Sequence, residues 1–372
     1  MTDVDLDVRR SLTSGRTLPA EWYTDGDVFR LELERIFERT WQCIGVADSL
    51  QAPGDFVTAT VGRVPIVVVR NKEGALRGFV NVCRHRCSEV VLEPTGHRNV
   101  LQCHYHAWTY DLDGRLISAP RSDREDDFDP ADYCLHAVQV DTLGPFVFVN
   151  LDASAPSLEH YLGDLVERMA ADGLTFDGLE YQGHWEQEVA ANWKIVVENF
   201  DECYHCPVAH PSFARTMEVG PDDYRLESDT WTSRAVTPLR TYPDGSADHY
   251  PYDVDGPVNL GQFAYLWPGF TLNQNPGSRS VTAFFFVPLG PEQTLLITEI
   301  YNDPATPADV VQARNEFGIQ VFNEDTILVE SVQRGLRSGR VRQGRLLLDS
   351  ERLIQHFQLL VESALAGSAN GD

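Results

Sequence analysis

The chain has 372 residues, a formal net charge of −26, 42% hydrophobic residues and 10% aromatic residues. Its length suits two domains or one large domain, and its composition is that of an ordinary globular protein. The strong negative charge argues against nucleic acid and anionic membranes as partners. No stretch approaches the roughly 20 apolar residues that a membrane-spanning helix needs.

The seven cysteines are an odd number, and three of them stand beside histidines in dense clusters. This usage favours metal chemistry in a reducing compartment over a disulfide framework. Residues 1–10 are acidic and lack the apolar core of a secretory signal. We therefore expect a cytoplasmic protein.

The first part of the chain predicts a helical segment followed by a small β domain. Residues 1–18 are polar and are expected to be loose, and a helix of about fifteen residues follows Asp25. Apolar runs between glycine turns predict the strands, which are 56–61, 64–69, 76–82 and 146–151. The next domain is expected to begin near residues 153–156.

The remaining chain predicts helices around a few strands. Residues 220–258 are rich in Asp, Pro and Tyr and are expected to form long loops. Strands are predicted over 185–189, 281–287 and 294–300. Helical spacing is found over 157–172, 192–205, 307–335 and 350–365.

A first chemical cluster lies between Cys83 and His106. It reads Cys83-Arg-His85, then seventeen residues, then Cys103-His-Tyr-His106. Two Cys and two His can hold zinc, and they equally suit a [2Fe–2S] centre in which two His replace two Cys on one iron. This stretch by itself leaves both metals open.

A second cluster follows about a hundred residues later. On a continuous helix Asp201 and His205 would share a face that Glu202 flanks, and Pro207 would break the helix so that His210 could approach His205. Two His and a carboxylate from elsewhere form the facial triad of non-haem Fe(II), which leaves positions open for O₂ and substrate.

Cys203 and Cys206 offer another interpretation of the same stretch, as a redox Cys-x-x-Cys pair or half of a zinc site. A redox pair usually opens a helix after a strand, whereas this one closes the predicted helix. A zinc site would need a second half nearby, and none is present. This stretch by itself leaves both interpretations open, and a metal site is favoured only when it is taken together with the first cluster.

The pattern Cys-x-His…Cys-x-x-His, followed by Glu/Asp-x-x-His-x-x-x-x-His, resembles the large (α) subunit of Rieske non-haem iron oxygenases. The resemblance covers nearly the whole chain. It implies an α+β fold, with a β-rich Rieske [2Fe–2S] domain and a helix-grip catalytic domain of helices and an antiparallel sheet. The implied parts are an N-terminal helical segment that packs on the catalytic domain (1–40), the Rieske domain (41–153) and the mononuclear iron domain (154–372).

The resemblance also implies the ligands of the Rieske cluster. Cys83 and Cys103 would bind one iron, and His85 and His106 the other. The two His raise the reduction potential relative to an all-Cys ferredoxin. The cluster could then accept electrons from a reductase or ferredoxin partner and pass them on.

For the mononuclear Fe(II), the resemblance implies His205 and His210 as ligands. The third ligand should lie in the long C-terminal helix, where Asp325 is preferred and Glu324 is the alternative.

In the family, a carboxylate before the first iron His links that His to a Rieske His of a neighbouring subunit. The matching residue is Glu202, with Asp201 as the alternative. The family's α subunits are commonly trimers, so a homotrimer is expected.

The segment Glu-Cys-Tyr-His-Cys-Pro is similar to oxygenases that act on quaternary ammonium compounds such as carnitine, glycine betaine and stachydrine. A methylated cation calls for an aromatic cage, and the candidates are Tyr204, Trp267, Phe270 and 284–286. The expected reaction is mono- or dioxygenation with O₂ and electrons from NAD(P)H through a separate reductase. This sequence has no Gly-x-Gly-x-x-Gly fingerprint of its own.

Two other functions remain open at this point. One is an aromatic ring-hydroxylating dioxygenase, and the other is a non-catalytic Rieske or zinc-binding protein.

Overall fold

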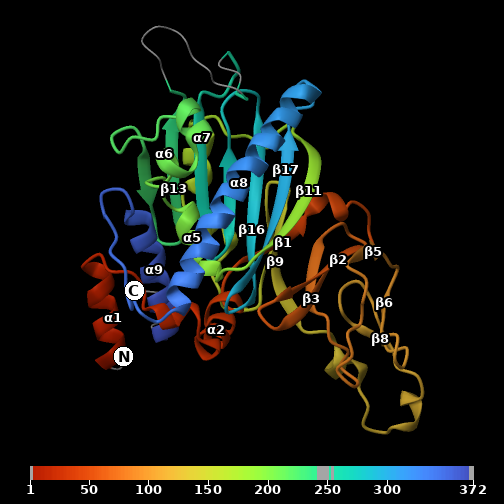
Figure 1. Cartoon of the computed structure of the whole chain (residues 1–372). Coiled ribbons are helices and arrows are strands. Elements are labelled where there is room, and N and C mark those ends of the chain that lie inside the picture. Colours follow the sequence, from red (N-terminus) through yellow and green to blue (C-terminus); the bar gives the residue numbers. More distant parts are fainter. Residues whose placement is uncertain (1–2, 241–250, 253–254, 368–372) are drawn as a thin grey trace. The chain divides into compact units, whose positions relative to one another are not determined.

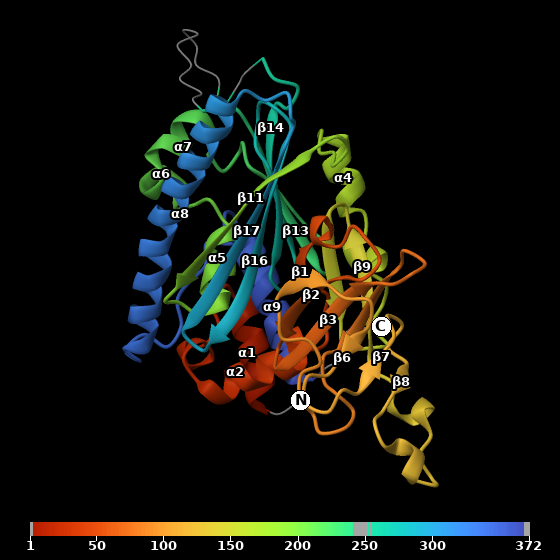
Figure 2. The same ribbon diagram turned by 90° about the vertical axis from the view of Figure 1, so that its right-hand side faces the viewer.

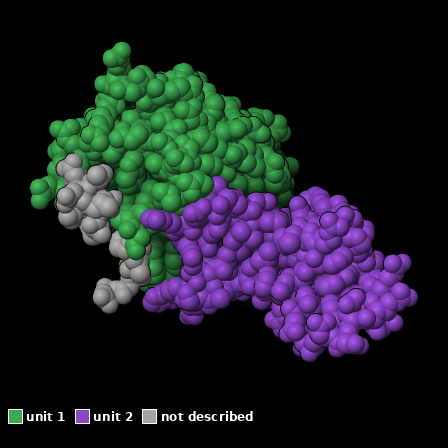
Figure 3. Space-filling view, turned by 90° about the horizontal axis from the view of Figure 1, so that it is seen from below, with its two compact units in different colours: residues 1–32, 161–372 green, residues 33–160 purple. Residues whose placement is uncertain are grey.

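The computed structural model describes residues 3–240, 251–252 and 255–367 (Figure 1). The chain divides into two compact units, one of residues 33–160 and one in which residues 1–32 join residues 161–372 (Figure 3). The expected α+β architecture is confirmed. None of the helices in these described ranges is long and apolar enough to cross a membrane.

The unit of residues 33–160 is built on an antiparallel sheet in the order β1-β10-β9-β4-β3-β2-β5. These strands are β1 (Gln42–Val46), β2 (Asp55–Val61), β3 (Val64–Arg70), β4 (Leu76–Val80), β5 (Thr95–His97), β9 (Ala137–Leu143) and β10 (Phe146–Asn150). A three-stranded sheet holds β6 (Leu101–Gln102), β7 (Thr109–Tyr110) and β8 (Leu116–Ser118). Short helical turns are η2 (Leu33–Phe37), η3 (Ala47–Ser49), η4 (Ser122–Arg124) and η5 (Pro130–Tyr133).

Strand β3 shows why this unit contains continuous apolar runs. Successive side chains of a strand point to opposite faces of the sheet. Ile66 and Val68 pack into one buried cluster, and Val67 and Val69 pack into another. Both faces of β3 are therefore covered, and its sequence is apolar without alternation.

The larger unit contains a second seven-stranded antiparallel sheet in the order β11-β17-β16-β15-β14-β13-β12. Its strands are β11 (Glu180–Val189), β12 (Arg225–Ser228), β13 (Thr232–Pro238), β14 (Leu260–Leu266), β15 (Phe270–Gln274), β16 (Ser280–Gly290) and β17 (Gln293–Asn302). Helices α6, α7 and α8 lie on one side of this sheet and α4 on the other (Figure 2).

The helices of this unit are α1 (Asp3–Thr13), η1 (Ala20–Tyr23), α2 (Gly26–Glu32), α4 (Leu165–Ala171), α5 (Trp193–Phe200), α6 (Cys206–Ala209), α7 (Pro211–Thr216), α8 (Ala308–Arg337) and α9 (Arg352–Ala366). Helix α3 (Leu158–Leu162) spans the boundary between the units. Helix α5 contacts α8 and strands β16 and β17.

Several sequence-based expectations for secondary structure are wrong. Residues 3–13 form α1, which lies beside α9, instead of a loose segment. The helix predicted over 157–172 is two short helices, separated at Gly163 where φ is +57°. The predicted loop of residues 220–258 contains β12 and β13, while its residues 241–250 and 253–254 lie outside the described residues.

Strands β13, β14 and β15 were not predicted from the sequence. The same reason applies to all three. Buried Thr232, Ser233 and Arg234 begin β13, and buried Gln262 and Asn273 lie in β14 and β15. These strands are buried at nearly every position but carry polar side chains, so they lack the long apolar runs that are typical of strands covered on both faces.

A buried ion pair joins the N-terminal segment to helix α5. The ammonium group of Lys194 contacts one carboxylate oxygen of Glu32, and both side chains are fully buried. The indole N–H of Trp193 donates to the other carboxylate oxygen at 2.8 Å. Desolvation lowers the pKa of Lys194 even though Glu32 opposes this shift.

We predict that Lys194→Met lowers the free energy of unfolding by about 3–5 kcal/mol, because it leaves the Glu32 carboxylate buried without its cation. Denaturant unfolding followed by circular dichroism measures the loss. The double variant Lys194→Met/Glu32→Gln should recover most of it, since no charge is then buried and the amide oxygen still accepts from Trp193. A single variant as stable as the wild type would contradict this account.

Candidate metal centres

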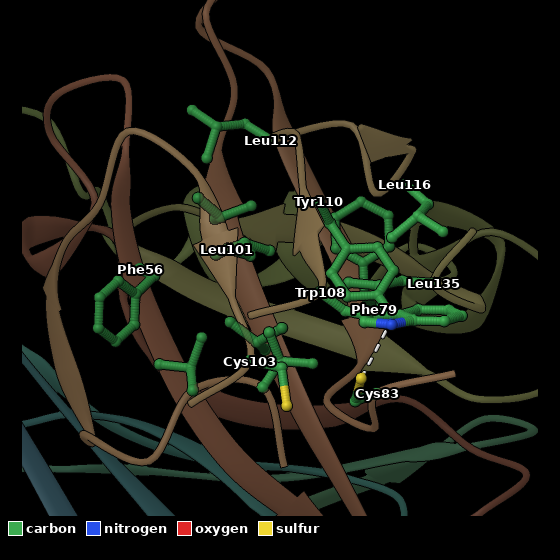
Figure 4. Packing of buried hydrophobic residues seen from close by; sticks show 14 residues of the cluster. Phe56, Phe79, Cys83, Leu101, Cys103, Trp108, Tyr110, Leu112, Leu116 and Leu135 are labelled. Atoms are coloured by element: carbon green, nitrogen blue, oxygen red, sulfur yellow. Dashed lines mark hydrogen bonds between the residues drawn. The ribbon is translucent and has the colours of Figure 1, made fainter. Parts of the chain in front are cut away.

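Two buried thiols lie at one side of a hydrophobic cluster in the unit of residues 33–160 (Figure 4). Cys83 and Cys103 are each 2% exposed, and both are free cysteines. The hydroxyl of Tyr110 lies 3.5 Å from the sulfur of Cys83 and accepts the backbone N–H of Arg84 at 3.0 Å. A polar group thus reaches a sulfur that lies within the hydrophobic cluster.

The two loops that carry these cysteines are built in the same way. The backbone N–H of Cys87 donates to the carbonyl of Cys83 at 3.0 Å, and that of Ala107 donates to the carbonyl of Cys103 at 3.0 Å. Cys87 and Ala107 have φ values of 56° and 59°, in the left-handed region that favours glycine. Each cysteine therefore opens an equivalent tight turn.

The histidines of the two loops lie at the exposed end of the same site. The rings of His85 and His106 are 4.6 Å apart, and His85 stacks on Trp108 at 5.0 Å. Partial desolvation and the neighbouring His106 lower the pKa of His85, which favours the neutral imidazole that binds metals. Two thiols inside and two imidazoles outside fit a [2Fe–2S] cluster with two His on its outer iron.

Helix α5 ends at Phe200, so the expectation of a continuous helix to His205 is wrong. Asp201 is buried and accepts a hydrogen bond from Ser233 at 2.9 Å, while Glu202 contacts His205. Desolvation raises the pKa of Asp201 to about 7. Asp201 is thus directed at the sheet, and it does not share a helix face with His205.

Three side chains from two distant segments converge on one point. The Nε2 atoms of His205 and His210 are 3.1 Å apart, and Oδ1 of Asp325 lies 2.9 Å from Nε2 of His210 and 3.4 Å from Nε2 of His205. His210 lies between α6 and α7, and Asp325 lies in α8. Among the described residues, this is the group of three His, Cys, Asp or Glu side chains close enough to hold one metal ion.

Each imidazole is oriented by a second carboxylate. Nδ1 of His205 donates to Glu202, and Nδ1 of His210 donates to Glu324 at 2.7 Å. Both Nε2 atoms are thereby directed toward Asp325, as is usual for histidines that bind metals. Glu324, the alternative third ligand from the sequence, thus lies on the outer nitrogen of His210. The sequence did not predict that Glu324 orients His210, because there Glu324 is only the neighbour of Asp325.

The acid–base properties of the centre reflect these contacts. Desolvation would lower the pKa of His205, but hydrogen bonds to Asp325 and Glu202 outweigh it and raise the pKa to about 9. Burial would likewise raise the pKa of Asp325, yet His205 and His210 hold it below its usual value. A metal ion that binds here must displace protons from the imidazoles. Two nitrogens and one carboxylate, without a thiolate, suit Fe(II) with open coordination positions.

Cys203 and Cys206 form a disulfide on either side of His205. The objection that this pair closes a helix is wrong, because α5 ends earlier and Cys206 is the first residue of α6. Both cysteines are buried in a cluster with Phe213 and Met217.

The aromatic residues considered for a cation cage do not form one cluster. Trp267 packs in the core against Trp193 and Phe357. Phe284 and Phe286 of strand β16 face Phe200 of α5. Phe285, which lies between them, points to the other face of the sheet.

Tyr204 is 59% exposed, and Phe270 is buried against Phe285. Phe284 and Phe286 are therefore the residues of this set that face Phe200, at the C-terminal end of α5.

Family models match both parts of the chain. The Rieske [2Fe-2S] domain matches residues 40–140, and the ring hydroxylating alpha subunit (catalytic domain) matches residues 176–367. The chain therefore belongs to the Rieske non-haem iron oxygenases, as the α subunit of an oxidoreductase with a [2Fe–2S] cluster and a non-haem iron domain. The family expected from the sequence is confirmed.

Individual relatives show which members of the family this chain is similar to. The carnitine monooxygenase oxygenase subunit of Acinetobacter pittii (strain PHEA-2) is 35% identical, over 93% of this chain and 94% of that protein. The chloroplastic choline monooxygenase of Spinacia oleracea is 32% identical, over 94% and 78% respectively. The crystal structure of a quaternary ammonium Rieske monooxygenase in complex with L-carnitine is similar with a TM-score of 0.81 and 33% identity, over 96% of this chain and 98% of that chain.

Another carboxylate of α5 lies outside the metal centre. Glu198 accepts hydrogen bonds from the hydroxyl of Tyr23 at 2.7 Å and from the amide of Gln358 at 2.9 Å. Desolvation raises its pKa from 4.5 to about 7. The folded protein therefore holds this proton more tightly than the unfolded chain, so its stabilising effect is complete below pH 4.5 and lost as the pH rises through 7.

We predict that Glu198→Gln raises the free energy of unfolding by about 1–3 kcal/mol at pH 8 and changes it little at pH 5. Glutamine mimics the protonated acid and still accepts from Tyr23 and Gln358. Thermal unfolding of both proteins at the two pH values measures the difference. The same stability change at both pH values would contradict the raised pKa.

Proposed function

We propose that this chain is the terminal oxygenase component that oxidises a small quaternary ammonium compound with O₂. The observation that carries the proposal is the convergence of His205, His210 and Asp325 beside Glu202. Relatives named for carnitine and choline, at 32–35% identity over more than nine tenths of this chain, support the substrate class.

The proposed ligands of the Rieske cluster are Cys83 and Cys103 on one iron and His85 and His106 on the other. Their support is the pairing of two free, buried thiols with two neighbouring exposed imidazoles. The apolar cluster around the thiols excludes water from one side of the site. The exposed imidazoles leave the other side accessible to a reductase or ferredoxin partner.

The proposed ligands of the mononuclear Fe(II) are His205, His210 and Asp325. The bound iron would supply the site for O₂ reduction beside the substrate. Glu202 and Glu324 hold the imidazoles so that both Nε2 lone pairs point at the metal position. Hydroxylation of an N-methyl group would give an unstable carbinolamine, which releases formaldehyde and a demethylated amine.

Several wider features belong to the same proposal. The domain division is 1–40, 41–153 and 154–372, and the matches of the two family models support it. A separate reductase supplies electrons from NAD(P)H, and the chain works as a homotrimer in the cytoplasm. A relative's structure reported for inter-subunit electron transfer supports an oligomer.

Glu202 is proposed to carry the link between the two metal sites, because it already holds Nδ1 of the iron-site His205. Asp201 is the alternative residue, but its carboxylate is bonded to Ser233.

We predict that Glu202→Gln slows electron transfer from the reduced cluster to the mononuclear site by about 10- to 100-fold, because it removes the charged acceptor that orients His205. Single-turnover absorption of the Rieske cluster measures the rate. Asp201→Asn is the matched control and should retain most of the rate. Normal transfer in Glu202→Gln together with a loss in Asp201→Asn would reverse the assignment.

The substrate class is tested by turnover of the reduced enzyme with a panel of betaines, carnitine, choline and arenes. We expect formaldehyde or another aldehyde from at least one quaternary amine, formed in proportion to the O₂ consumed. Three irons per chain and a red-brown colour should accompany activity, whereas a zinc protein would be colourless. Dihydrodiol from an arene, without any product from the quaternary amines, would instead indicate a ring-hydroxylating dioxygenase.

A further inference from the structure

A sulfur atom lies next to the metal-facing nitrogen of His205. Sγ of Cys206 is 3.9 Å from Nε2 of His205, the same atom that lies 3.1 Å from His210 and 3.4 Å from Asp325. In a tetrahedral site with Zn–N of about 2.0–2.1 Å and Zn–S of about 2.3 Å, these two donors would be about 3.5 Å apart. The sulfur therefore lies beside one of the three donors. It is outside the group of ligand atoms that lie within 4.8 Å of one another, so it must move toward the other two donors before it can bind the same ion.

In the present structure this sulfur is not a thiol, because it is bonded to Cys203. A disulfide sulfur offers no thiolate to a metal, so the available donors are two imidazoles and one carboxylate. Such a set leaves coordination positions open and suits Fe(II). A free thiolate at Cys206 would add a fourth, soft donor, and four donors of this kind close a tetrahedral zinc site.

We propose that the Cys203–Cys206 pair is a redox-active modification site that decides which metal the mononuclear centre holds. With the disulfide intact the centre is an open Fe(II) site. With the disulfide reduced, Cys206 joins His205, His210 and Asp325 and the centre binds Zn²⁺ in a closed, inactive form. This inference rests on the proposed function, because it assumes that these three residues hold the catalytic iron.

The reduction requires a dithiol as the co-reactant. One thiolate of the dithiol attacks a sulfur of the disulfide, which forms a mixed disulfide and releases the other cysteine. The second thiol then displaces the remaining cysteine, and the reductant leaves as a cyclic disulfide. Two electrons and two protons reach the cysteine pair, and the proton of Cys206 is released when its sulfur binds zinc.

The surroundings of the pair make its redox state persistent. Cys203 and Cys206 are 8% and 5% exposed, and they pack against Phe213, Met217 and Tyr252. A reductant must wait for a local opening of this cluster before it can attack either sulfur. Reduction of the native protein should therefore be slow, and each state can be prepared and compared.

The test uses the full chain with its Rieske cluster intact and its mononuclear metal removed by a chelator. One sample is kept oxidised and another is treated with a dithiol, and differential alkylation with mass spectrometry reports the state of residues 203 and 206. Each sample then receives Zn²⁺, and X-ray absorption at the zinc edge identifies its neighbours without interference from iron. We expect one sulfur at about 2.3 Å in the reduced protein and nitrogen and oxygen alone in the oxidised protein.

Two serine variants break the same disulfide with opposite expected results. Cys203→Ser leaves the Cys206 thiol free, so zinc should have a sulfur neighbour under both conditions. Cys206→Ser removes that thiol, so zinc should have none under either condition. Cys43→Ser, in strand β1 of the other unit, is the matched control and should behave as the wild type.

The outcomes distinguish a failure of the disulfide inference from a failure of the proposed function. Zinc without a sulfur neighbour in both the reduced wild type and Cys203→Ser would overturn the role of the disulfide and leave the iron site intact. Sulfur around zinc in Cys206→Ser would place the metal at other thiols and would also overturn it. Failure of the oxidised protein to bind either Fe(II) or Zn²⁺ at this centre would instead contradict the proposed function.

Discussion

The catalytic unit depends on a shared arrangement of carboxylates around two imidazoles. Asp325 lies between the Nε2 atoms of His205 and His210, while Glu202 and Glu324 hold the opposite nitrogens. Two segments more than a hundred residues apart must therefore be positioned together. The long helix α8 supplies both Glu324 and Asp325, so its placement against α5 and the sheet decides whether the centre forms.

Buried polar contacts fix the helix that leads into this centre. Lys194 is paired with Glu32, and Glu198 is held by Tyr23 and Gln358, so both ends of α5 are tied to the N-terminal segment or to α9. Such groups are stable in the interior because each has a partner. The N-terminal residues thus contribute to the catalytic unit although they lie far from it in sequence.

The Rieske unit separates the four proposed cluster ligands by polarity. The thiols of Cys83 and Cys103 are buried in the hydrophobic cluster, whereas His85 and His106 are exposed. A cluster held in this way is insulated on its sulfur side and accessible at its imidazoles. This polarity suits an electron relay that meets a partner through its histidines.

The sequence alone determined the family, the two metal motifs and strands β2, β3, β4 and β10 of the Rieske unit, because close spacing and apolar runs are local properties. It did not predict that α5 ends at Phe200, where the Glu202 carboxylate accepts the backbone N–H groups of Tyr204 and His205 and so competes with the helix. Nor could it decide between Glu324 and Asp325, since neighbours on a helix point about 100° apart. Only the tertiary structure shows that Glu324 lies at Nδ1 and Asp325 at Nε2 of His210. The packing of α8 determines which carboxylate reaches which nitrogen.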